Sequence, residues 1–177
     1  MSLPHARNAD VALLHPVFRA AVIDVHNRLT AEGIPFKVFE AFRYPERQAD
    51  LYAQGRTKPG AIVTKARPWT SYHQYGLAVD FVLYENGKWS WETAGAKRKW
   101  WQRMQDLGRE MGLEALSFEL PHLQLAGLKI ESLLAGEYPA GGDDSWAENV
   151  DAAIRGWQGR GKVPPPPPVP ERPAMPT

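Results

Sequence analysis

Two histidines and one aspartate in this 177-residue chain have the types and setting of a metal site. His73 lies just before an apolar stretch, residues 76–84, that is typical of a buried strand, and His122 lies between two later strands. Asp80 lies inside the apolar stretch, where a carboxylate is costly to bury unless it is paired or bound to metal. Two imidazoles and one carboxylate, with a fourth position left to water, match a catalytic zinc site.

Glu119 precedes His122 by three residues and is a candidate general base. Positions i and i+3 of an ideal strand face opposite ways, so the chain must bend near Pro121 if both side chains are to face one metal. With that bend, Glu119 would accept a proton from the attacking water and pass it to a leaving amine. Salt-bridged acids and ordinary polar histidines are the alternative that these residue types leave open.

The composition restricts the function classes. The absence of cysteine excludes disulfides, thiol nucleophiles, iron–sulfur clusters and thiolate zinc sites. A formal net charge of +1 does not favour a nucleic-acid partner held by bulk electrostatics. No apolar run approaches the roughly 20 residues that span a bilayer, so we expect a soluble protein without stable membrane insertion. The remaining histidines, His5, His15 and His26, are expected to be ordinary side chains rather than ligands.

Apolar periodicity and turn residues predict an α+β fold, with a small antiparallel sheet flanked by helices. Helices are predicted over residues 16–32, 45–54 and 97–112, and after a capping box that starts at Ser145. Strands are predicted over residues 36–42, 76–84, 89–91, 113–118 and 122–127. Asn86 and Gly87 predict a type I′ hairpin turn.

One folded domain is predicted over residues 1–161, with its core motifs in 16–126 and a helical extension in 127–161. The apolar stripe from Trp146 to Trp157 is expected to pack into the core, with a partner-binding face as the alternative. Eight of the 16 prolines lie in the last 14 residues, so residues 162–177 are predicted to be a disordered, proline-rich tail.

Two separated motifs resemble those of the M15 zinc peptidases. The first, S-x-H-x-x-G-x-A-x-D, spans residues 71–80 and follows a GRTKPG loop at 55–60, and the second, E-x-P-H, spans 119–122. More narrowly, the chain resembles the L-alanyl-D-glutamate endopeptidases of bacteriophage endolysins and related bacterial cell-wall peptidases. The resemblance runs from the first helix to Gln124, and it implies the fold of D-Ala-D-Ala carboxypeptidases and Hedgehog-like proteins.

The resemblance assigns a role to the residues that match the motifs. His73, Asp80 and His122 would bind Zn²⁺. Glu119 would be the general base, at a position where many endolysins of the family carry Asp and the related D-Ala-D-Ala dipeptidases usually carry Glu.

Three further residues match positions to which the family assigns other roles. Arg43 matches the arginine that steadies the carbonyl oxygen of the scissile peptide, with an ion pair to Glu40 or Glu46 as the alternative. Ser71 and Gln48 match positions that suggest substrate contact.

The implied function is hydrolysis of the L-Ala–D-Glu bond in peptidoglycan stem peptides. One alternative is a D,D-carboxypeptidase or dipeptidase that releases terminal D-Ala, and another is a non-catalytic peptidoglycan-binding or secretion accessory module. Residues 112–118 lack the Trp-Gly-Gly stretch of many relatives, which leaves substrate preference open. The basic residues Arg56, Lys58, Lys65 and Arg67 would guide carboxylate-rich peptides or form an ordinary solvated loop.

The expected partner is therefore the peptidoglycan stem peptide, and the protein is expected to be a monomer. The N-terminus lacks the apolar core and cleavage site of a signal peptide. We expect synthesis in the cytoplasm and action on periplasmic or cell-wall peptidoglycan after release, for example through a holin-like pore. A phage lysis gene and a bacterial secretion cassette both fit this expectation.

Overall fold

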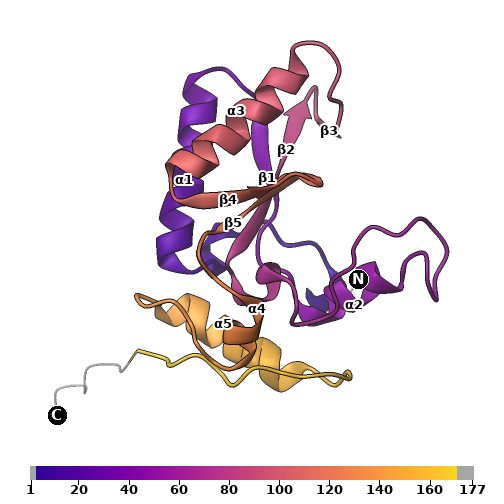
Figure 1. Ribbon diagram of the computed structural model, residues 1–177, viewed down its shortest axis with the longest axis vertical. Coiled ribbons are helices and arrows are strands. Elements are labelled where there is room, and N and C mark those ends of the chain that lie inside the picture. The colour runs from indigo at the N-terminus through magenta and orange to yellow at the C-terminus, as the bar shows by residue number, and fades with distance from the viewer. Residues whose placement is uncertain (1–2, 171–177) are drawn as a thin grey trace.

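The computed structural model describes residues 3–170, and a five-stranded antiparallel sheet lies at its centre (Figure 1). The strand order is β1-β2-β5-β4, and β3 pairs with β2 off this path. The strands are β1 (Phe36–Glu40), β2 (Ala78–Glu85), β3 (Lys88–Ser90), β4 (Leu113–Leu116) and β5 (Glu119–Leu125). The predicted α+β class is confirmed.

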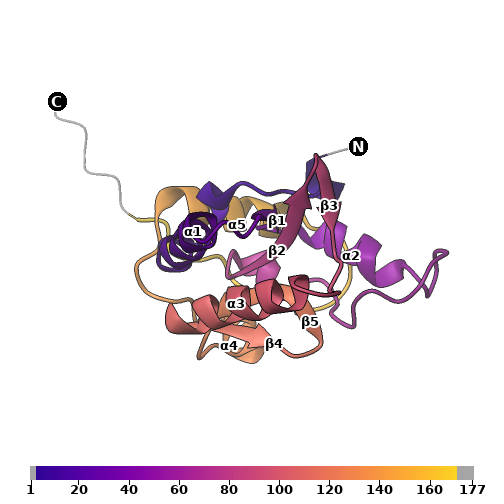
Figure 2. The ribbon, with the colours of Figure 1, turned by 90° about the horizontal axis from the view of Figure 1, so that it is seen from above.

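Two helices, α1 (Pro16–Ala31) and α3 (Lys97–Glu110), pack against each other and against the sheet (Figure 2). The ring of Phe36 in β1 lies edge-on to Trp101 of α3, with centroids 5.0 Å apart. The other helices are α2 (Pro45–Ala53), α4 (Ile130–Leu134) and α5 (Asp144–Gly156), with short 3₁₀ turns η1 (Leu3–His5), η2 (Val11–Leu13) and η3 (Tyr72–Tyr75). Within the described residues, none of these helices has the length and apolar character to cross a membrane.

A β-bulge in β1 brings an acid to the sheet face that carries Asp80. Val38 pairs with Phe81 and Glu40 pairs with Asp80, so Phe39 is an extra residue in the register. Regular alternation would have put Glu40 on the same face as Val38, towards the helices. The bulge instead places Glu40 beside Asp80, which is how bulges near functional sites commonly re-aim side chains.

A second irregularity bends the chain beside the candidate base. The register of β4 and β5 shifts between Ala115 and Leu116, so residues 120–122 have no counterpart on β4. Glu119 and His122 therefore come to the same side, with Glu119 Oε2 3.5 Å from His122 Nδ1. The bend that the sequence required at this point is present.

One local prediction is confirmed and one is wrong. Asn86 and Gly87 have φ angles of +52° and +74°, as a type I′ turn requires. Helix α5, however, is capped by Asp143, whose carboxylate accepts a hydrogen bond from the Trp146 backbone N–H at 3.0 Å. The helix thus begins before Ser145, whose hydroxyl instead donates a hydrogen bond to the Ala12 carbonyl at 3.2 Å.

Helix α5 is attached to the start of β2 through Trp146. Its indole N–H donates to the Tyr75 carbonyl at 2.8 Å, and its ring lies edge-on to His15 at a centroid distance of 4.7 Å. Trp146 and Val150 are buried, and Trp157 is partly buried against the core. The predicted packing of this apolar stripe is therefore confirmed.

The described part of the proline-rich segment is packed rather than free. Residues 162–170 form no helix or strand, yet Pro164 and Pro167 are buried. The Tyr138 hydroxyl donates to the Pro165 carbonyl at 2.6 Å. This packing differs from the disorder expected from composition, while residues 171–177 lie outside the described part of the chain. The domain boundary at residue 161 stays a prediction.

Gly76→Ala should destabilise the protein more than Gly33→Ala. Both glycines have left-handed φ angles, +66° and +73°, so alanine costs about 1–2 kcal/mol at either position. A Cβ on Gly76 would lie 2.8 Å from Cδ1 of Trp146, whereas a Cβ on Gly33 meets nothing within 4 Å. Overpacking should add about 1–3 kcal/mol for Gly76→Ala in urea unfolding. Equal losses would contradict the close packing of α5 on Gly76.

Candidate metal centre

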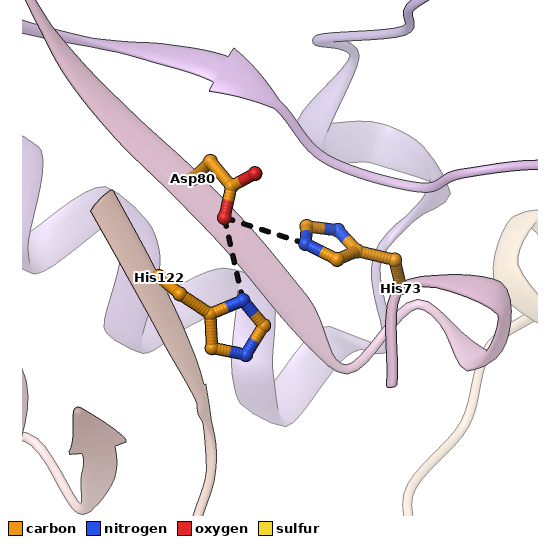
Figure 3. Close-up of side chains that lie close together, drawn as sticks. All are labelled: His73, Asp80 and His122. Atoms are coloured by element: carbon orange, nitrogen blue, oxygen red, sulfur yellow. Dashed lines mark ion pairs between the residues drawn. The ribbon is translucent and has the colours of Figure 1, made fainter. Parts of the chain in front are cut away.

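The three predicted ligands converge on one oxygen atom. His73 Nε2 lies 3.4 Å and His122 Nδ1 lies 3.3 Å from Asp80 Oδ1 (Figure 3). One ligand atom from each residue lies within 4.8 Å of the other two. Ligands at about 2.0–2.1 Å from a tetrahedral zinc stand about 3.3–3.4 Å from one another. The spacing and the donor types therefore fit a zinc-sized ion.

Each ligand comes from a different element of the sheet region. Asp80 in β2 and His122 in β5 are directly opposite each other in the register of the two strands. His73 lies in η3, where the Ser71 hydroxyl accepts a hydrogen bond from its backbone N–H at 3.3 Å. Gly76, with a left-handed φ of +66°, then turns the chain from η3 towards β2. This turn lets His73 and Asp80, which belong to the same motif, point towards each other.

Hydrogen bonds on the far side of each imidazole orient the two nitrogens that could bind a metal. His73 Nδ1 lies 2.8 Å from the Ala41 carbonyl, which only accepts, so this nitrogen carries the proton and Nε2 is left for a metal. His122 Nε2 lies 2.8 Å from Oε1 of Gln124, a buried side chain. His122 Nδ1 is itself buried and lacks a hydrogen-bond partner in residues 3–170. An unpartnered ring nitrogen aimed at a carboxylate is what a metal ligand requires.

The electrostatics keep the central acid ionised. Burial alone would raise the pKa of Asp80, but the neighbouring imidazoles of His73 and His122 outweigh burial and hold this pKa well below its ordinary value. Burial lowers the pKa of His122, and the neighbouring Asp80 carboxylate more than compensates, so the net shift is upward. A buried anion between two imidazoles favours a cation at this point.

Arg43 lies beside the cluster as a buried cation. Its guanidinium donates to Glu40 Oε1 at 2.8 Å and to Gln48 Oε1 at 2.9 Å, and Nη2 lies 3.5 Å from Asp80 Oδ2. Burial opposes its charge, but the Glu40 carboxylate outweighs burial and raises the pKa of Arg43. The ion pair with Glu40 thus exists, and it holds the guanidinium next to the metal cluster.

Gln48 and Ser71 differ in their access to substrate. Gln48 is completely buried, with its amide donating to the Ala66 carbonyl at 2.7 Å and its oxygen accepting from Arg43 and Gln74. Direct substrate contact by Gln48 therefore does not match the structure, because its side chain is buried and both of its polar atoms are already hydrogen-bonded within the protein. Ser71 lines the cleft as well as capping η3.

A cleft opens above the cluster between the 61–72 loop and the turn that joins β4 to β5. Ile62 and Val63 on one side are 57% and 54% exposed, and Phe118 on the other is 78% exposed. The polar lining includes Arg43, His73, Glu119 and His122. Apolar walls over a polar floor suit an extended peptide whose central carbonyl must reach the cluster.

Most of the basic residues of the loop stabilise it. Arg56 lies over the Tyr52 ring at 3.8 Å, Arg67 donates to the Tyr52 hydroxyl at 3.2 Å, and Lys58 pairs with an acid of α2. Lys65 alone among the four predicted basic residues lines the cleft. Guidance of anionic peptides therefore stays a prediction for Lys65. Arg56, Lys58 and Arg67 instead contact residues of α2 and so hold the loop in place.

Glu40 and Gln124 belong to the site but were not among the predicted residues. Glu40 had a signal, because it is an acid inside an apolar strand, which is the argument that singled out Asp80. Gln124 had no such signal, since a glutamine in a half-buried strand is unremarkable by type.

A His-Asp-His cluster that could hold a metal ion, beside a cleft at a small antiparallel sheet, is the arrangement expected of an M15 peptidase. Residues 12–132 match the family described as VanY, D-alanyl-D-alanine carboxypeptidase, and the chain belongs to this family. It is 37% identical over 122 residues to the peptidoglycan L-alanyl-D-glutamate endopeptidase CwlK of Bacillus subtilis, which covers 63% of this chain and 73% of CwlK. It is also similar to the crystal structure of the Serratia marcescens L-Ala D-Glu endopeptidase ChiX, with 23% identity, a TM-score of 0.42, and 69% of this chain and 91% of ChiX covered.

Gln124→Leu should weaken metal binding about 10–100-fold, because His122 would lose the acceptor that fixes its ring. Gln124→Glu keeps an acceptor at the same place and should bind metal close to the wild-type affinity. Titration of the metal-free variants with Zn²⁺ against a competing chelator measures both. Unchanged affinity in a folded Gln124→Leu variant would show that His122 needs no such support.

Proposed function

We propose that the chain is a zinc-dependent endopeptidase that hydrolyses the L-Ala–D-Glu bond of peptidoglycan stem peptides, in lysis or remodelling of the cell wall. The observation that carries the proposal is the cluster of His73, Asp80 and His122, whose two histidines line the cleft together with Glu119 and Arg43. The 37% identity to an enzyme named for this bond supports the choice of bond.

His73, Asp80 and His122 would hold the zinc ion, since two imidazoles and a carboxylate leave a fourth position for water or substrate. When bound, zinc supplies Lewis-acid polarisation of the scissile carbonyl and promotes ionisation of water.

Glu119 would move the proton. Its side chain is 43% exposed and lines the cleft, and its Oε2 lies 3.5 Å from His122 Nδ1. From there the carboxylate would take a proton from the attacking water and return it to the leaving amine of D-Glu.

Arg43 would bind the carbonyl oxygen as negative charge develops on it. Its guanidinium is held in place by Glu40 and Gln48, so little reorganisation is needed during the reaction. A fixed cation in a partly desolvated cleft is the kind of group that stabilises an oxyanion. Ser71, at the cleft wall, would contact the substrate chain.

Release of terminal D-Ala is the second candidate function. The description of the matched family as D-alanyl-D-alanine carboxypeptidase favours it, as does glutamate rather than aspartate at position 119. The proximity of His73, Asp80 and His122, with Glu119 and Arg43 lining the same cleft, supports a catalytic protein over the non-catalytic module. A monomeric state and release through a holin-like pore stay predictions.

Digestion of purified disaccharide stem peptides should yield a product with a new N-terminal D-Glu, detected by mass spectrometry. Preincubation with a zinc chelator should abolish the product, and added Zn²⁺ should restore it. Release of free D-Ala without a new N-terminal Glu would assign the chain to the carboxypeptidase alternative.

Glu119→Gln should lower kcat about 10²–10⁴-fold while zinc affinity stays close to wild type, because the amide cannot accept the proton. Glu114→Gln is the matched control, since Glu114 is an exposed acid of β4 outside the cleft lining. Activity that survives in zinc-loaded Glu119→Gln would rule out Glu119 as the general base.

A further inference from the structure

Four aromatic side chains lie together near the cluster of His73, Asp80 and His122, on and next to β1, β2 and β3. Phe39 lies edge-on to Trp89 and Trp91 at centroid distances of 5.1 and 5.3 Å, and Tyr84 lies edge-on to Trp89 at 4.9 Å. We call Phe39, Tyr84, Trp89 and Trp91 the aromatic platform. Its members are only partly buried, and Trp91 is 53% exposed. A contiguous aromatic group that solvent reaches, with one ring largely exposed, is typical of a binding surface.

The platform continues the sheet face that carries the metal cluster. Asp80 and Tyr84 are four residues apart in β2, so their side chains lie on the same face, about 13 Å apart along the strand. Tyr84 is paired directly with Trp89 of β3. Phe39 is the bulged residue next to Glu40, which pairs with Asp80. One extended ligand on this face can therefore reach both the cluster and the platform.

The rings are held rigidly. The Arg7 guanidinium lies 4.3 Å from the Phe39 centroid, and the Lys37 ammonium lies 4.1 Å from the Tyr84 centroid. Together with the edge-on ring contacts, these cations fix the rings before any ligand arrives. A preorganised surface loses little side-chain entropy on binding.

The charges around the platform are of both signs. Arg7 and Lys37 lie over two of the rings, while Glu92, next to Trp91 in the chain, pairs with Lys97 at 3.1 Å. Such a rim does not make the single-sign field that would attract a nucleic acid or an anionic membrane. An exposed tryptophan ring within a mixed polar rim suits a neutral sugar, whose C–H face packs on the ring while its hydroxyls bond to the rim.

We propose that the aromatic platform binds the sugar strand of peptidoglycan while the stem peptide occupies the cleft. This inference rests on the proposed function for its choice of ligand. The L-Ala of a stem peptide is joined through a lactyl group to the muramic sugar, so the sugar is one residue from the L-Ala–D-Glu bond. One residue, the lactyl group and the near edge of the ring span about 10 Å, which is comparable to the separation along β2.

A sugar-only titration tests the surface independently of catalysis. The full chain, labelled with ¹⁵N, is titrated with the N-acetylglucosamine tetramer, and the tryptophan indole N–H signals are followed by NMR. The Trp89 and Trp91 signals should shift, while that of Trp146, whose N–H is bonded to the Tyr75 carbonyl, should stay unchanged. Trp91→Ala should weaken tetramer binding about tenfold, and Trp91→Phe, which keeps a ring, should restore most of it.

A kinetic comparison then connects the surface to the reaction. For Trp91→Ala, the ratio of kcat/KM on glycan-linked stem peptide to kcat/KM on sugar-free stem peptide should fall about tenfold. An equal change on the two substrates, or no indole shift at millimolar tetramer, would overturn the proposal. Binding of phosphatidylglycerol vesicles in place of the tetramer would also overturn it, by assigning the surface to a membrane. Loss of the bond assignment alone would leave the sugar titration unaffected.

Discussion

The ionised carboxylate of Asp80, held on a central strand among largely buried side chains, sets the arrangement around it. A buried charge without partners costs several kcal/mol, so the fold must bring positive or metal-binding groups to it from distant parts of the chain. Two imidazoles meet one carboxylate oxygen and the Arg43 guanidinium approaches the other. Glu40 then compensates the arginine. Each charged side chain in this network is paired with one of opposite sign, and the last member is Arg47 of α2, which pairs with Glu40.

Because of this network, the two faces of the sheet differ: one packs into the core, and the other carries the polar cluster. Helices α1 and α3 cover the face that carries the aromatic and aliphatic core, which anchors β1 and β2. The other face keeps the polar cluster accessible through a cleft and continues into the aromatic platform. Helix α5 supports the turn that leads from η3 into β2. Trp146 packs against this turn at Gly76, between His73 and β2.

Local patterns predicted the elements well because local forces determine them. The Asn86–Gly87 turn and the three long helices with their apolar stripes follow from φ preferences and periodicity, and the acid in an apolar strand pointed to Asp80. What the sequence could not supply was the register. The bulge at Phe39 brings Glu40 to Asp80, and the hydrogen bonds of Gln48 and Gln124 depend on strands and helices far apart in sequence. The cap at Asp143 is local, because its carboxylate accepts from the backbone N–H of Trp146, and it also pairs with Arg19 of α1.

The proline segment that packs beside Tyr138 shows how surface can be covered with little loss of chain freedom. Proline has a fixed φ and no backbone N–H, so residues 164–168 are already restricted when unfolded and need no partner strand for their donors. Burying Pro164 and Pro167 therefore removes apolar area from water at a smaller entropic cost than an ordinary loop would incur. Such a segment is conformationally restricted before it packs, and it covers the C-terminal helices without extending the sheet.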